Sequence, residues 1–342
     1  MERLIQRDID ILSALVSEYI STAAPVGSAA IAKAWGIGLS TASIRNVLAK
    51  LEEMGLLAQP HTSAGRVPTN PGLRFYVNTI LNQRELSEKE KAAISGQFDR
   101  TPSNTEDILR RANKILSLIS NYTGLVVLPK VDRLTLKHME FLPLTTGKCL
   151  GIFVSREGIV HNRVIDIGED FTYPDLEKIS NYCNTAFYGH SLEDAAKKIS
   201  KEMEKAQSRY DRLIGKALFL AGELLDESAT DELLVHGEAK LLTAPEFADV
   251  KKLREVMDAL EEKKGLLHLL ERAAEGDDVC VFIGSESNYS AMTNCSIVTT
   301  RYKKADGIVG TLGVIGPTRM DYSKVIPTVD FTAKIVNELL NT

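Results

Sequence analysis

The sequence predicts an α+β protein: an N-terminal helical unit with a small hairpin, then an antiparallel-sheet domain interrupted by a mostly helical segment. Three observations predict this class. Apolar residues recur at helical spacing through residues 3–54. Short runs typical of strands occur between residues 124 and 167 and again between 279 and 315, and about a hundred residues of mostly helical pattern separate the two groups.

Composition and length favour a soluble cytoplasmic protein of several compact units. The 342 residues exceed the usual size of one domain. The first ten residues interleave acids and bases, so we expect no secretory signal. No apolar run approaches the roughly 20 residues that cross a bilayer. The scattered cysteines form no CxxC pair and predict unpaired thiols rather than a disulfide or zinc framework: Cys149, Cys183, Cys280 and Cys295.

The charge is unevenly distributed along the chain. The net charge of −5 argues weakly against nucleic-acid binding. Residues 1–78 nevertheless hold seven Lys or Arg and six Asp or Glu, whereas the remainder carries a net charge of −6. Any nucleic-acid site is therefore expected near the N-terminus, where repulsion of phosphates is smallest.

The first 55 residues predict three helices with a tight turn before the last. The first helix spans residues 3–20, where apolar residues form one stripe. Ser28 is a suitable N-cap for a short second helix, and a glycine-containing turn at 35–39 follows. Ser40 caps a third helix that Gly55 closes. This pattern is a helix-turn-helix.

The third helix carries a polar face in its first two turns, composed of Thr41, Ser43, Arg45 and Asn46. Arginine pairs with guanine and asparagine with adenine in the major groove, while the hydroxyls suit bases or phosphates. Taken alone, these four residues fit a solvated helix face better than a recognition surface.

The residues after this helix favour DNA binding. Residues 56–59 and 66–68 predict two short strands joined by a loop, and a hairpin directly after a recognition helix is a wing. Arg66 supplies charge beside the tip. The tip is small and polar, which permits close approach to a sugar-phosphate backbone: His61, Thr62, Ser63, Ala64 and Gly65. Helix-turn-helix and wing together predict a winged-helix DNA-binding unit.

Four stretches resemble one bacterial family, the heat-inducible transcription repressor HrcA. They are PVGSAAIA (25–32), LSTASIRNVLAKLEEMGLL (39–57), PHTSAGRVPTNPGLRFYV (60–77) and GTLGVIGPTRMDY (310–322). The resemblance implies a repressor of chaperone operons of the groE and dnaK type. It also implies that a dimer binds an inverted-repeat operator, the CIRCE element, and that the GroEL chaperonin maintains the active state.

The resemblance assigns the DNA contacts position by position. Ala29 stands where family members often carry a basic residue, and Leu73 where they usually carry an aromatic one. The first departure removes the basis for one phosphate contact from the second helix and leaves the base-reading positions intact. The DNA-binding residues implied are Ser40, Thr41, Ser43, Arg45, Asn46, His61, Thr62, Ser63, Gly65 and Arg66.

The rest of the chain predicts a sheet and its helices. We expect helices at 70–81, at 108–119 and at the end of the chain, 327–340, with a long amphipathic segment at 192–227. Strands are expected at 124–128, 136–142, 149–155, 160–167, 279–283, 296–302 and 308–315.

The resemblance names the domains that these elements form. We expect residues 1–82 to form the winged-helix DNA-binding domain and 83–103 a connector with one short helix. The resemblance implies that residues 104–174 and 275–342 form a GAF-like domain and that 175–274 form an inserted dimerisation domain.

No catalytic or cofactor motif is found. Glycines recur every third residue from Gly307 to Gly316, but the spacing matches neither dinucleotide motif nor P-loop and favours close backbone packing. The six histidines stand far apart without metal-ligand spacing. We therefore expect no enzyme activity, no cofactor and no metal.

Two alternatives to a dimeric repressor stay open on the sequence. An enzyme or ligand sensor would place its activity in the GAF-like part, and turnover of a nucleotide by residues 104–342 would support it. A protein-interaction adaptor would use the winged helix as a docking surface, and salt-insensitive partner binding would favour it.

Overall fold

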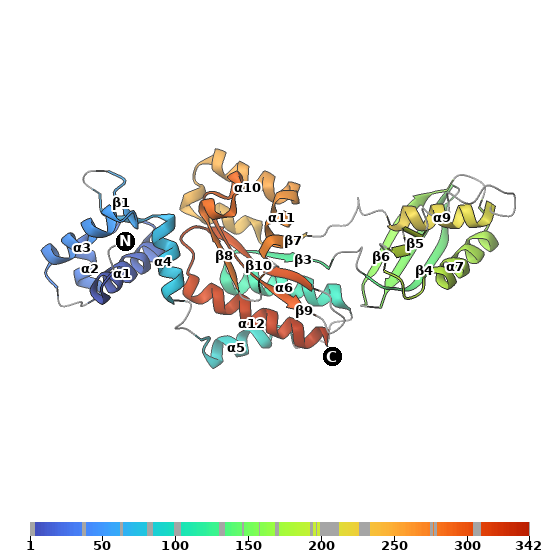
Figure 1. Ribbon diagram of the computed structural model, residues 1–342, viewed down its shortest axis with the longest axis horizontal. Coiled ribbons are helices and arrows are strands. Elements are labelled where there is room, and N and C mark those ends of the chain that lie inside the picture. Colours follow the sequence, from blue (N-terminus) through green and yellow to red (C-terminus); the bar gives the residue numbers. More distant parts are fainter. Residues whose placement is uncertain are drawn as a thin grey trace.

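The computed structural model shows a chain of mixed helices and strands, which confirms the α+β class. Figure 1 shows the N-terminal helices at one end, a five-stranded sheet in the middle and a three-stranded sheet at the other end. The structure describes the chain except residues 1–3, 36–38, 62–63, 81–84, 99–103, 130–133, 146, 157, 168–170, 192–193, 196, 199–211, 226–232, 274–275, 277–278, 304–308 and 342.

Three helices and a hairpin form the N-terminal unit. Their bounds are α1 Gln6–Thr22, α2 Ser28–Trp35, α3 Thr41–Glu53, β1 Leu57–Ala58 and β2 Val67–Pro68. Apolar stripes of α1 and α3 meet in the core, where Ile11, Leu15, Ile44 and Leu51 are fully buried. The buried Asp8 of α1 accepts from Lys50 Nζ of α3 at 2.9 Å, so an ion pair also fixes these two helices.

Helices α4 (Asn70–Ile80) and α5 (Glu88–Ser95) lead from the hairpin to the middle of the molecule. The helix expected at 70–81 is confirmed to within one residue, and the connector does hold one short helix. Thr69 starts α4 because its Oγ1 accepts from Gly72 N at 3.2 Å. Ile94 and Phe98 are buried, so these two side chains anchor the connector in the core.

An antiparallel five-stranded sheet forms the central unit, in the order β7-β3-β10-β9-β8. Helices α6 (Thr105–Ser120) and α12 (Tyr322–Leu340) cover one face, and α10 (Val250–Glu262) and α11 (Lys264–Ala273) cover the other. The strands are β3 Thr123–Val127, β7 Leu233–His236, β8 Cys280–Ile283, β9 Cys295–Lys303 and β10 Val309–Pro317. Short 3₁₀ helices η4 Glu238–Thr243, η5 Pro245–Phe247, η6 Gly284–Ser287 and η7 Ser290–Met292 connect them.

A second sheet, in the order β4-β5-β6, forms the third unit with α7 and α9 on one face. The bounds are β4 Leu136–Thr145, β5 Lys148–Ser155, β6 Val160–Asp166, α7 Tyr173–Phe187 and α9 Arg212–Leu225. The single sheet expected from the sequence is therefore wrong. Residues 136–166 form a sheet of their own. Strand β7 belongs to the central sheet, and α10 and α11 pack on it, so the two units do not divide at 175 and 274.

The pattern of burial differs between the two sheets. All five residues of β3 are buried, as in a strand covered on both faces. Strand β5 alternates buried and half-buried residues, as in a strand covered on one face. Alternation identifies a strand with one buried face, but it does not identify which sheet the strand joins.

Three further expectations met different outcomes. The closing helix starts at Tyr322 rather than Pro327, because burial of Tyr322 and Val325 favours a helix that contains the proline. Strand β7 lies in a segment expected to be mostly helical. Of the segment 192–227, α9 is helical, residues 199–211 lie outside the described residues, and one continuous helix stays untested.

Close backbone packing of the glycines is confirmed within the described residues. A Cβ at Gly313 would lie 2.2 Å from the Val298 carbonyl oxygen, and one at Gly310 would overlap the Tyr302 ring. Gly307 lies outside the described residues. All four cysteines are free thiols. Among the helices that the structure describes, none is long and apolar enough to span a membrane.

Candidate nucleic-acid interface

The start of α3 is fixed by its own side chains. Ser40 is the N-cap: its Oγ accepts from Ser43 N at 3.1 Å and lies 3.0 Å from Ser43 Oγ. Two of the proposed DNA-contacting hydroxyls therefore already hold the first turn in place. The free amides of this helix end carry partial positive charge, which favours an anion such as phosphate.

The face of α3 that the sequence singled out is open to solvent. Thr41, Arg45 and Asn46 are exposed, and none of them bonds to another side chain of the described residues. The opposite stripe is buried in the core and consists of Ile44, Val47, Leu48 and Leu51. The structure thus brings Thr41, Arg45 and Asn46 together on one accessible face near the start of the helix.

Arg66 is held within the protein. Its Nε donates to Glu52 Oε2 at 2.8 Å, which connects β2 to the end of α3. Its backbone pairs with Val26 through two hydrogen bonds of 2.8 and 2.9 Å. Glu52 was not predicted as a partner, because no local sequence pattern indicates an ion pair between residues 14 positions apart.

Gly65 allows the hairpin to lie against the segment before α2. A Cβ at this position would lie 2.4 Å from Val26 C and 2.8 Å from Gly27 N. Since both neighbours are backbone atoms, a larger residue requires the backbone to move. Gly65 therefore serves the packing of the hairpin.

The described part of the hairpin tip is exposed and polar. His61 is exposed, and its carbonyl accepts from Ala64 N at 2.9 Å. Gln59 Nε2 donates to the Ala64 carbonyl at 3.0 Å, which ties the tip to β1. Thr62 and Ser63 lie outside the described residues.

Charge separates along this surface. Arg45 near the start of α3 and Lys33 on α2 are exposed cations without an ion pair among the described residues. The end of α3 carries the acids Glu52 and Glu53. The cationic part of the surface therefore coincides with the exposed start of α3.

Two arginines fasten the N-terminal unit to the central unit. Arg74 of α4 forms a bidentate ion pair with Glu286 and donates to the Val281 carbonyl. Burial alone raises the pKa of Glu286, but hydrogen bonds from Arg74 and the Ile283 amide lower it overall. Arg319 Nη1 donates to the Ile20 carbonyl, at the end of α1, at 3.0 Å.

Helices α2 and α3 pack together across a short connection, and an exposed polar helix start beside a hairpin is typical of DNA-binding helix-turn-helix regulators. The comparisons agree with this class. Residues 106–326 match the protein family described as HrcA protein C terminal domain. The chain is 40% identical over 340 residues to the heat-inducible transcription repressor HrcA of Geobacter sulfurreducens, covering 99% of both chains.

A second relative and a solved structure extend this result. The chain is 36% identical to the heat-inducible transcription repressor HrcA of Syntrophobacter fumaroxidans, covering 99% of this chain and 98% of that one. A crystal structure of a hypothetical protein matches with a TM-score of 0.70 and 24% identity over 99% of both chains, which shows the fold. The chain therefore belongs to the HrcA family, a family of heat-inducible transcription repressors and not of enzymes.

Proposed function

We propose that this chain represses transcription of chaperone operons of the groE and dnaK type by binding the inverted-repeat CIRCE operator as a cytoplasmic homodimer. The observation that carries the proposal is the exposed face of α3, where Thr41, Arg45 and Asn46 stand without side-chain partners among the described residues. Arg45 and Asn46 read base edges in the major groove, and Thr41 contacts a base or a phosphate.

The remaining residues of the winged helix position this face on the duplex. Ser40 and Ser43 hold the first turn so that its amides meet a phosphate. His61, Thr62 and Ser63 form the wing tip beside the sugar-phosphate backbone. Gly65 and Arg66 fix the wing against α2 and α3, and the outer nitrogens of Arg66 contact a phosphate while Nε stays on Glu52.

An uncovered sheet face supports the homodimer. The cross-strand pairs Leu150 with Val164 and Val154 with Val160 lie on the face of the three-stranded sheet opposite α7 and α9. Val160 is 47% and Val164 is 50% exposed. An inverted repeat requires two half-site readers at fixed separation, so a second copy of the chain is the occupant that the operator's symmetry demands.

The central five-stranded unit is the GAF-like domain of this proposal, and it sets the distance between the two winged helices. The exposed apolar face also suits capture by the GroEL chaperonin when a dimer separates, because chaperonins bind exposed apolar surface of incompletely assembled proteins. Binding by GroEL returns the protein to its active state. A fall in the concentration of free GroEL therefore relieves repression of the operons.

Footprinting on DNA upstream of chaperonin genes tests the DNA-binding function. We expect wild-type protein and the Arg254→Ala control, an exposed arginine of α10, to protect both arms of an inverted repeat. Arg45→Ala is expected to lose that protection at the same protein concentration. Equal protection by both variants would contradict the assignment of α3 as the reading helix.

Sedimentation tests the dimer separately. Val160→Asp and Val164→Asp place charge on the uncovered face and are expected to yield monomers, whereas Val250→Asp, at a site 70% exposed on α10, is expected to stay dimeric. Point changes are more specific than deletion of the expected dimerisation domain, 175–274, because such a deletion removes β7 from the central sheet. A tight dimer in both face variants would refute the proposed interface.

A further inference from the structure

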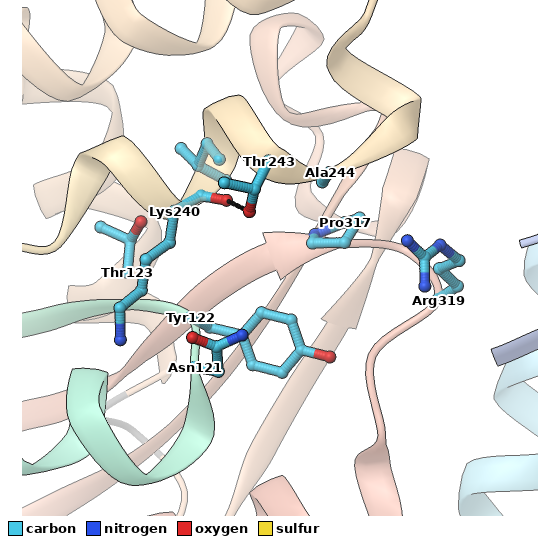
Figure 2. Close-up of a pocket in the computed structure, with 9 residues that line it drawn as sticks. Asn121, Tyr122, Thr123, Lys240, Thr243, Ala244, Pro317 and Arg319 are labelled. Carbon is cyan, nitrogen blue, oxygen red and sulfur yellow. Dashed lines mark hydrogen bonds between the residues drawn. The ribbon is translucent and has the colours of Figure 1, made fainter. Parts of the chain in front are cut away.

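A polar cavity of about 220 Å³ lies at the edge of the central unit nearest α1. Its walls come from the start of β3, from η4 and from the segment after β10. Figure 2 shows Lys240 and Arg319 towards opposite ends of the cavity, with the Tyr122 ring between them. The DNA-binding surface on α3 and the hairpin does not include these residues.

Lys240 brings an unneutralised cation to this cavity. Its Nζ donates to the Ser117 carbonyl oxygen, and it forms no ion pair with any carboxylate among the described residues. The side chain is half-buried, and burial lowers its pKa. An ammonium has three donors, so further hydrogen bonds to an anion are open to it.

The neighbouring side chains offer further donors. The Tyr122 hydroxyl accepts from the Asp321 amide at 3.3 Å and keeps its own proton to donate. The amide of Asn121 is exposed and has no side-chain partner among the described residues. A cavity rich in donors, with one unpaired ammonium, is complementary to an anion.

Arg319 connects the cavity to the N-terminal unit. Its guanidinium forms an ion pair with Glu246 and donates to the Ile20 carbonyl at the end of α1 at 3.0 Å. Glu246 Oε2 is buried and has no hydrogen-bond partner. One carboxylate oxygen of Glu246 is thus unsatisfied, and an anion that enters the cavity competes with Glu246 for the Arg319 guanidinium.

We propose that this cavity binds a small anionic metabolite whose carboxylate or phosphate group pairs with Lys240 and whose other end reaches Arg319. The volume lies below the roughly 300–1,000 Å³ of pockets for drug-sized ligands, so the ligand is small. Because Arg319 also holds α1, binding changes the attachment of the winged helix. This coupling rests on the proposed DNA-binding function, whereas the anion site itself does not.

Calorimetric titration of the full chain, without DNA, tests the site. The probes are inorganic phosphate and, separately, succinate, in chloride at constant ionic strength. We expect saturable binding of at least one probe to wild-type protein and to the control Lys252→Gln, an exposed lysine of α10. Lys240→Gln is expected to weaken that binding at least about tenfold, since a hydrogen bond to a charged group is lost.

Lys240→Arg keeps the charge and is expected to retain binding, which separates loss of charge from loss of folding. Binding of phosphate alone or succinate alone identifies the anionic group. Absence of saturable binding of both probes, or equal binding by Lys240→Gln and Lys252→Gln, would overturn the site. In a second step the bound probe is expected to change operator affinity in wild-type protein and not in Lys240→Gln. Unchanged wild-type affinity would overturn the coupling.

Discussion

The pairing of Arg66 with Glu52 yields a prediction that separates two roles of one arginine. Arg66→Gln removes both the ion pair within the protein and the proposed phosphate contact. Glu52→Gln removes the ion pair alone and leaves the guanidinium available to DNA. Glu53→Gln, an exposed acid on the next residue of α3, controls for the loss of a negative charge near the duplex.

The structure sets the size of both effects. The two side chains are 21% and 33% exposed at an N–O distance of 2.8 Å, so the pair stabilises the hairpin by about 0.2–1 kcal/mol. Each phosphate contact contributes about 0.9 to the slope of log affinity against log salt. Loss of one contact per chain lowers the magnitude of that slope by about 0.9 per chain. The factor by which affinity falls between 50 and 200 mM salt then becomes about 3.5 times smaller.

Fluorescence anisotropy with operator and random duplexes at several salt concentrations measures the slope, and thermal unfolding measures the stability. We expect Arg66→Gln and Glu52→Gln to lose similar stability while Arg66→Gln alone lowers the slope. The same slope in Arg66→Gln as in wild-type protein would confine Arg66 to its structural role. A lower slope in Glu52→Gln would show that the ion pair positions the contact.

Three further predictions concern Arg45, Gly65 and the four cysteines. Arg45→Ala is expected to weaken operator binding by about 1–3 kcal/mol in anisotropy, with random DNA and the Arg254→Ala control unaffected; equal losses on both duplexes would refute base reading. Gly65→Ala is expected to destabilise the N-terminal unit by about 1–3 kcal/mol in thermal unfolding, because its Cβ would clash with Val26. Gly27→Ala is the control, since a Cβ at Gly27 meets nothing within 4 Å. Similar losses of stability in the two variants would refute the clash at Val26. Burial raises the pKa of Cys149 to about 11 and those of Cys183 and Cys295 to about 12, above the ordinary 9.0. At pH 8 thiolate is therefore scarcer at these three positions than in an ordinary thiol, by about a hundredfold or more. Burial also raises the pKa of the half-buried Cys280, but Arg74 and Arg272 oppose that shift. Mass spectrometry should therefore find Cys280 alkylated first, and equal rates at all four cysteines would refute the prediction.

The helices of the N-terminal unit were predicted well, because helical periodicity and capping depend on residues that are close together in the sequence. The stripe of α3 is buried as its spacing predicts, and Ser40 caps the helix as its hydroxyl predicts. The exposed face with Arg45 and Asn46 follows from the same 3.6-residue period, since a helix that buries one stripe exposes the other. The DNA contacts themselves stay predictions.

Contacts between distant segments were not predictable from the sequence. Whether Gly65 serves DNA approach or packing depends on Val26, which is 39 residues away and pairs with Arg66. The division into two sheets failed for the same reason. Strand β3 pairs with β7 and β10, which follow more than 100 residues later, and hydrophobic alternation contains no information on such partners.

Helix α4 contacts both the N-terminal unit and the central unit. At its start, Thr69 donates from its backbone to the Leu56 carbonyl and from Oγ1 to the Gly55 carbonyl, so the turn after α3 is fixed to α4. Further along, Arg74 binds Glu286 and the Val281 carbonyl of the central unit. A displacement of the central unit along this helix therefore moves the end of α3 and the hairpin together. Contacts with a distant part of the chain therefore fix the exposed face of α3 relative to the central unit, although local sequence determines which residues that face contains.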